Sequence, residues 1–127
     1  MFKTDPSTWS DPRHREGARA EQLSADLLRR DGYVILEQRF RFHRHDIDIV
    51  SRKDSVVVFA EVKSRRGRRF GTAAESVTRR KQYELVRAAG AWLQRHGRPG
   101  DLCRFDVVTV EGAEVQWLQS AFRPLWR

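Results

Sequence analysis

The segment DIDIVSRKDSVVVFAEVKSRRG, residues 46–67, decides how this chain folds, because it sets acidic residues beside the most hydrophobic run of the sequence. Two stretches of strand-forming residues, 46–51 and 56–63, flank a polar turn at residues 52–55. A turn this short makes the two strands antiparallel neighbours. Burying a charge costs free energy unless the charge is paired or binds a metal. The acidic residues in these hydrophobic strands therefore call for a partner or a metal ion.

Counting along the two strands brings their charged side chains together. Successive side chains of a strand point to opposite faces, so Asp46 shares a face with Asp48. By the same rule Glu61 shares a face with Lys63. The antiparallel turn then puts Asp48 next to Glu61, at a cross-strand distance of about 5 Å. Two carboxylates at that separation predict a site for Mg²⁺, to which the main-chain carbonyl of Val62 would add another oxygen.

The position of Lys63 beside this predicted metal site indicates phosphodiester hydrolysis. That reaction needs an activated water, a counter-charge for the phosphate in the transition state, and stabilisation of the leaving oxygen. A lysine next to the metal can orient or deprotonate the water, or offset the phosphate charge. The spacing therefore predicts a catalytic site made of Asp48, Glu61 and Lys63.

The rest of the chain predicts one α/β domain around this segment. A helix from the N-cap Asp11 to about residue 30 has an apolar arc that also contains Glu21. The order is helix, three strands, helix, then a strand or hairpin, which predicts a mixed central sheet flanked by helices. Residues 1–10 are expected to be a flexible tail and 11–127 a single domain. The other predicted elements are a helix at about residues 78–96 and strands at 33–42, 104–110 and 114–118.

Composition narrows the classes of function. The chain has 127 residues, a net charge of +8 and a pI of about 10.7, a balance that favours an anionic partner, most often nucleic acid. Its longest apolar run, Val56–Ala60, is too short to span a membrane, and no signal peptide is evident, so a cytoplasmic location is expected. The lone Cys103 cannot form an internal disulfide and is interpreted as a structural thiol.

Two basic segments lie close in sequence to the predicted site. One follows Lys63 directly, and the other starts the second helix, where cations oppose the helix dipole and so need another reason. We predict that both segments contact the phosphate backbone of DNA, which carries no sequence information. The residues concerned are Arg65, Arg66, Arg68, Arg69, Arg79, Arg80 and Lys81.

These motifs resemble a known nuclease pattern. The residues DIDIV…VVVFAEVKSR resemble the PD-(D/E)XK nuclease superfamily, with Asp48 as the first acid and Glu61–Val62–Lys63 as the (D/E)XK element. Over about residues 15–122 the chain also resembles the small bacterial YraN-like family, which is similar to archaeal Holliday-junction resolvases. The stretches that carry this resemblance are 17–21, 32–36, 47–50, 58–65, 104–108 and 121–122, with Val77, Lys81, Ala89 and Trp92–Leu93.

The resemblance implies a restriction-endonuclease-like core and a Mg²⁺-dependent endonuclease, with Mn²⁺ able to substitute, that cuts branched or structured DNA. It implies that Glu21 is a further catalytic acid that reaches the metal through water. A symmetric homodimer is expected because a junction has two cleavage points; no small-molecule organic cofactor and no membrane partner are expected. The family usually has Gly-Glu where this chain has His45–Asp46, so Asp46 is left open as a metal ligand or an ion-pair partner.

Other interpretations stay open. The same fold could serve as a nucleic-acid-binding module with little or no cleavage, so whether the protein is an enzyme is not decided by the fold. A ribosome-associated basic protein would explain the charge but leave the acids unexplained. His43 and His45 share a strand face, but no further Cys or His lies nearby in the sequence to complete a zinc site.

Overall fold

The computed structural model describes residues 12–64 and 77–124, with side chains described from residue 15 onward. Within these residues, two helices and a five-stranded mixed sheet confirm the α/β class and are consistent with the restriction-endonuclease-like core expected from the sequence. The expected tail at residues 1–10, the N-cap Asp11 and the basic residues Arg65, Arg66, Arg68 and Arg69 lie outside the described residues. The elements are α1 (Pro12–Arg30), β1 (Val34–Phe42), β2 (His45–Lys53), β3 (Val56–Ser64), α2 (Arg79–His96), β4 (Leu102–Glu111) and β5 (Glu114–Phe122).

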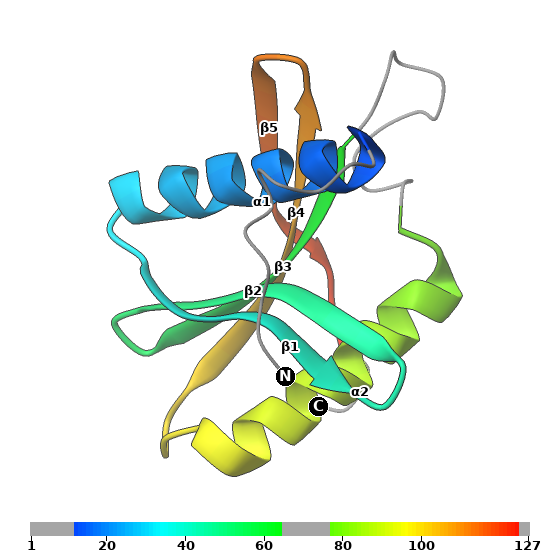
Figure 1. Ribbon diagram of the computed structural model, residues 1–127. Helices are drawn as coiled ribbons and strands as arrows, with labels where there is room; N and C mark the ends of the chain where they lie inside the picture. The colour runs from blue at the N-terminus through cyan, green and yellow to red at the C-terminus, as the bar shows by residue number, and fades with distance from the viewer. Residues whose placement is uncertain (1–11, 65–76, 125–127) are drawn as a thin grey trace, which may run out of the picture.

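The sheet has the strand order β1-β2-β3-β4-β5. The pairs β1–β2, β2–β3 and β4–β5 are antiparallel and joined by short turns, whereas β3 and β4 are parallel. A parallel pair needs a long crossover connection, and α2 lies in that connection. The expected meander of three strands followed by a helical crossover is therefore present (Figure 1).

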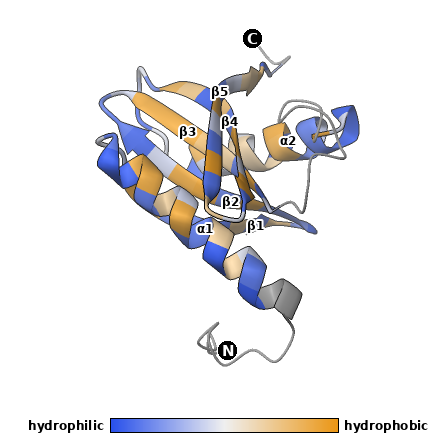
Figure 2. Ribbon diagram, turned by 90° about the horizontal axis from the view of Figure 1, so that it is seen from above, coloured by the Kyte–Doolittle hydropathy of each residue, from blue (hydrophilic) through white to orange (hydrophobic). Residues whose placement is uncertain are grey.

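The two helices cover opposite faces of the sheet (Figure 1). Both faces are apolar because the central strands carry hydrophobic residues on both sides, and Figure 2 shows these residues concentrated in β3 and β4. The core on the α1 face includes Ala25, Leu28, Ile49, Val58 and Ala60, and the core on the α2 face includes Val57, Phe59, Leu85, Ala89 and Trp92.

Local sequence signals set the helix ends. α1 ends in a Schellman motif, in which the Tyr33 N–H donates to the Leu28 carbonyl at 3.0 Å. Gly32 in this motif has a φ of +94°, a conformation that glycine adopts without strain. Thr78 caps α2, because its side-chain oxygen accepts a hydrogen bond from the Lys81 N–H at 3.1 Å. The cap places Lys81 in the first turn of the helix.

The last two strands are longer than predicted. β4 begins at Leu102 and β5 continues to Phe122, so the predicted end at residue 118 is wrong. The β4–β5 register shifts between Phe105 and Val107, and Ser120 has a φ of +53°. An irregularity of this kind lets a strand continue where the apolar–polar alternation is lost, which is where the predicted strand ended.

Asp106 is a fully buried acid that holds this irregular region together. Its carboxylate accepts hydrogen bonds from Arg104 Nε and Nη2 at 2.9 and 2.8 Å, from Trp117 Nε1 at 2.8 Å and from the Ser120 N–H at 3.0 Å. Arg104 is 20% exposed and also donates to the Tyr33 hydroxyl. Both carboxylate oxygens of Asp106 are thus satisfied, as burial requires.

Replacing Asp106 with alanine should lower the free energy of unfolding by about 3 kcal/mol, because the guanidinium of Arg104 would keep its charge without its partner. Urea unfolding should show a lower midpoint with an unchanged slope. Asp26→Ala is the matched control: its pair with Arg29 is half exposed and should contribute less than about 1 kcal/mol. Equal losses in the two variants would contradict a special role for Asp106.

Candidate active site

The predicted acids meet where β2 and β3 separate. Their ladder ends at the pair Ile49–Ala60, so Asp48 is the next residue of β2 and Glu61 its counterpart on β3. Asp48 Oδ2 accepts a hydrogen bond from the Val62 N–H at 2.8 Å. The side chain of Asp48 thus satisfies a strand N–H that β2 no longer pairs with. A strand residue directs its N–H and its carbonyl to the same neighbour, so the Val62 carbonyl faces this gap too.

Glu61 is almost fully buried, at 5% exposure. Its Oε2 atom lies 3.3 Å from Lys63 Nζ, two residues along the same strand, and 4.0 Å from Lys81 Nζ in the first turn of α2. Its Oε1 atom is buried and has no hydrogen-bond partner among the described residues. A buried carboxylate oxygen without a donor is unfavourable, so this atom retains the capacity to accept a donor or coordinate a cation.

Asp48 has a strongly raised pKa. Burial, and then the charge of neighbouring Glu61, raise the pKa of Asp48 from its ordinary 3.8 to about 7, against the opposing effect of the Val62 N–H. The charge of Glu21 raises the pKa of Asp48 further, and that of Lys81 lowers it. Two ionised carboxylates that share a partly buried site repel each other, and a cation bound between them offsets this repulsion. Acids perturbed in this way cluster at functional sites.

Glu21 of α1 stands beside the same acids. Its carboxylate accepts hydrogen bonds from Gln38 Nε2 at 3.0 Å and from Arg39 Nε at 3.2 Å, both on β1. The Glu21 side chain is only 13% exposed, and its charge reaches Asp48 strongly enough to affect the pKa of that carboxyl. A glutamate therefore occurs on the apolar arc of α1 because it points into the site rather than into solvent.

Gln38 and Arg39 are the residues of this site that the sequence did not single out. Arg39 falls opposite Asp48 in the β1–β2 register, and its φ of +55° is uncommon for a residue with a side chain. Such strained backbone persists where the surroundings enforce it, often at functional sites. The sequence does not predict the positive φ of Arg39, because this backbone conformation depends on how α1 packs over β1.

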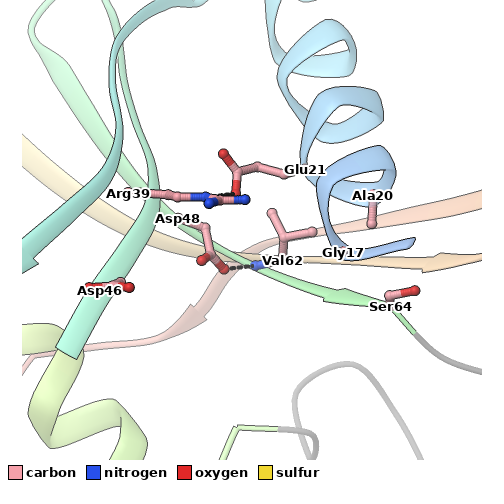
Figure 3. A pocket seen from close by; sticks show the side chains of 8 residues that line it. All are labelled: Gly17, Ala20, Glu21, Arg39, Asp46, Asp48, Val62 and Ser64. Carbon is pink, nitrogen blue, oxygen red and sulfur yellow. Dashed lines mark hydrogen bonds and ion pairs between the residues drawn. The ribbon is translucent and has the colours of Figure 1, made fainter. Parts of the chain in front are cut away.

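A cleft of about 260 Å³ is lined by Asp48 and Glu21 together with Arg39 and Val62. Figure 3 shows the Arg39 side chain reaching the carboxylate of Glu21, and the Asp48 carboxylate meeting the main-chain nitrogen of Val62. Asp46 lines the cleft and makes an exposed ion pair with Arg41 at 3.2 Å. The remaining lining residues, Gly17, Ala20 and Ser64, are small and leave the cleft open.

Comparison with known sequences identifies the family. The sequence model of the uncharacterised protein family UPF0102 matches residues 20–110. This chain belongs to the UPF0102 family. A UPF0102 protein of Symbiobacterium thermophilum is 46% identical over 97 residues, which are 76% of this chain and 82% of the relative. A UPF0102 protein of Halorhodospira halophila is 44% identical over 117 residues, which are 92% of this chain and 93% of the relative. One of Alkalilimnicola ehrlichii is 43% identical over 112 residues, which are 87% of this chain and 89% of the relative.

In this UPF0102 chain the predicted basic residues of α2 separate into two groups. Lys81 faces Glu61 across the end of the sheet and so belongs with the acids. Arg79 and Arg80 are exposed, and Arg80 forms an ion pair with Glu84 at 3.4 Å. The structure therefore brings only Lys81 of this set to the acidic residues.

A zinc site has no support in the described part of the UPF0102 chain. His43 is exposed, and His45 Nδ1 lies 3.2 Å from Glu84 Oε1 of α2. Across residues 12–64 and 77–124, no three Asp, Glu, His or Cys side chains converge as a metal-binding group. Cys103 is half-buried against the core on the α2 face, in agreement with a structural thiol. Neither α1 nor α2 is long and apolar enough to cross a membrane.

Proposed function

We propose that this UPF0102 protein is an endonuclease-like enzyme of the PD-(D/E)XK superfamily that hydrolyses phosphodiester bonds in DNA with the help of a divalent metal. The observation that carries the proposal is the juxtaposition of Asp48 and Glu61 at the gap between β2 and β3, with Lys63 Nζ 3.3 Å from Glu61. The order of helix, three strands, helix and parallel strand supports it.

The residues present fit Mg²⁺. Glu61 Oε1 has no hydrogen-bond partner among the described residues, and Asp48 lies close enough to Glu61 for their charges to repel. Mg²⁺ is commonly bound by one or two carboxylates and several waters, so a group of three acidic ligands is not required. Asp48, Glu61 and the carbonyl of Val62 would hold the ion, with Glu21 acting through water; Mn²⁺ would substitute.

The bound ion would supply Lewis-acid polarisation of a phosphate oxygen and lower the pKa of a coordinated water. Lys63, next to Glu61 and 35% exposed, orients the attacking water or offsets the phosphate charge. Lys81 shares Glu61 Oε2 with Lys63 and limits the charge repulsion among the acids. Arg39 holds Glu21 in place while its own side chain stays 48% exposed beside the cleft.

The finer features of the proposal come from the similarity to resolvases. They are a branched or structured DNA substrate and a symmetric homodimer. A cytoplasmic location is a separate part of the proposal. Net charge of +8 supports a polyanionic partner. Arg79 is exposed near the start of α2. We propose that it contacts the phosphate backbone of DNA, together with Arg65, Arg66, Arg68 and Arg69, which lie outside the described residues.

The second candidate is a nucleic-acid-binding module of the same fold with little or no cleavage. The observation that favours it is that no three ligating side chains converge within residues 12–64 and 77–124. Binding would still depend steeply on salt, because it releases counterions from DNA.

Cleavage assays separate the two candidates. With Mg²⁺ or Mn²⁺, the wild-type protein should nick or cut at least one substrate among duplex, flapped and four-way-junction DNA, and Glu61→Gln should not. Calorimetry should show divalent-ion binding to wild type and about tenfold weaker binding to Glu61→Gln, because a neutral amide replaces one of two anionic ligands. DNA binding without cutting, for every substrate and metal, would overturn the nuclease proposal in favour of the binding module.

A further inference from the structure

A second and larger hollow lies on the outer side of α2. It has a volume of about 700 Å³. We call it the α2–β5 groove: it is lined by Arg79, Tyr83, Val86 and Arg87 of α2 and by Phe122 and Arg123 at the end of β5. At 100° per residue these four α2 positions fall on one side of the helix, whereas Leu85 and Ala88 face the sheet. The groove is therefore separate from the acidic cleft.

An exposed aromatic ring dominates the groove. Tyr83 is 64% exposed, although a large aromatic side chain of a small protein is usually covered. The guanidinium carbon of Arg87 lies 5.9 Å from the centroid of the Tyr83 ring. Val86 and Phe122 extend the apolar lining. An open ring with a cation beside it is the arrangement on which nucleic-acid bases stack.

The rim of the groove is cationic. Arg79, Arg87 and Arg123 line it, and none of them takes part in an ion pair with a carboxylate of the described residues. A second copy of the chain seated here by two-fold symmetry would bring like charges together, which is unfavourable. The charge of the rim therefore favours an anionic occupant, and the exposed ring favours an occupant with flat apolar surfaces. A polynucleotide strand has both features.

We propose that the α2–β5 groove binds unpaired nucleotides of DNA, with a base stacked on Tyr83 and phosphates held by the arginines of the rim. The inference rests on the proposed function, because it takes DNA as the ligand. A base inside a duplex hides its faces, so stacking on Tyr83 selects an unpaired strand. The volume is that of a pocket for a drug-sized molecule, which suits one or two nucleotides and not a duplex.

The first turns of α2 lie between the buried acid Glu61 and the groove. Lys81 Nζ lies 4.0 Å from Glu61 Oε2, and the next residue, Gln82, lines the groove. The width of one helix, about 10 Å, separates the two places. We therefore infer that a single strand leaving a duplex beside Glu61 continues past the first turns of α2 into the groove. This position gives the protein a means to prefer branched over fully paired DNA.

Fluorescence anisotropy in EDTA tests the inference without any cleavage. The probes are a blunt duplex and the same duplex carrying an unpaired oligothymidine arm. Wild type should bind the armed duplex more tightly than the blunt one. Tyr83→Ala should weaken binding of the armed duplex by about tenfold and leave blunt-duplex binding unchanged, because a stacked base contributes about this much. Tyr83→Phe keeps the ring and should keep the preference.

Leu102→Ala is the matched control, since Leu102 is also 64% exposed but lies outside the groove; it should change neither affinity. Equal binding of both probes by wild type would overturn the inference, as would an unchanged preference in Tyr83→Ala. A wild-type dimer that Tyr83→Ala converts to a monomer, with the arm preference intact, would assign the groove to a second copy instead. Absence of cutting would count against the proposed nuclease only, because these measurements need no metal.

Discussion

Replacing Lys63 with alanine should lower the rate of metal-dependent DNA cleavage by about 100- to 1000-fold while DNA affinity changes by less than about threefold. The ammonium of Lys63 lies 3.3 Å from Glu61 Oε2, and the Lys63 side chain is 35% exposed, so it contacts both a buried acid and solvent. A group in that position acts on the attacking water or on the phosphate in the transition state. It is one of 25 Lys and Arg residues, so its share of the phosphate affinity is small.

Two further variants show the cause of the lost cleavage activity. Lys53→Ala removes an exposed lysine at the far end of β2 and should leave cleavage unchanged. Lys63→Arg keeps the charge but cannot give up a proton, so partial activity in that variant would assign Lys63 to charge offset, and none would assign it to the water. Cleavage at the wild-type rate by Lys63→Ala would show that Lys63 is only the ion-pair partner of Glu61.

The meeting of Asp48 and Glu61 could be predicted from the sequence because it needs only local information. The polar stretch at residues 52–55 predicts a short turn that makes β2 and β3 antiparallel neighbours, and counting outward from it gives the observed register. The shared face of Glu61 and Lys63 follows from the alternation of a single strand. Neither step depends on how distant segments pack.

The surroundings of Glu21 could not be predicted, because they depend on packing between distant segments. The apolar arc of α1 indicated that Glu21 faces inward, but its hydrogen bonds to Gln38 and Arg39 require α1 to cross β1 at one angle. They also require the φ of +55° at Arg39, which cannot be predicted from the residue type. The same limit applies to Asp106, whose partners Trp117 and Ser120 lie beyond a register shift.

Asp48→Asn should make the metal-free protein more stable at pH 8, by up to about 4 kcal/mol. The pKa of Asp48 is raised to about 7 from 3.8, so its ionised form is disfavoured in the folded state. The stabilising effect of the neutral carboxyl is fully present below pH 4 and is lost as the pH rises through 7. Asparagine stays neutral at every pH and keeps an oxygen for the Val62 N–H. Urea unfolding in EDTA should therefore show a gain at pH 8 that vanishes near pH 4.

Asp46→Asn is the matched control, because Asp46 lies on the same strand in an exposed ion pair and should change stability by less than about 1 kcal/mol at either pH. An Asp48→Asn variant that is less stable than wild type at pH 8 would contradict the prediction.

Divalent metal should reduce the stability advantage of Asp48→Asn over wild type at pH 8. An ion that binds the folded state raises the free energy of unfolding with its concentration. Millimolar Mg²⁺ should therefore raise the unfolding midpoint of wild type at pH 8 and raise that of Asp48→Asn much less. The instability that the ionised carboxylate causes in the metal-free protein is then the reason the cleft attracts a cation. If Mg²⁺ stabilises both proteins equally, Asp48 is not a ligand, and its raised pKa reflects burial alone.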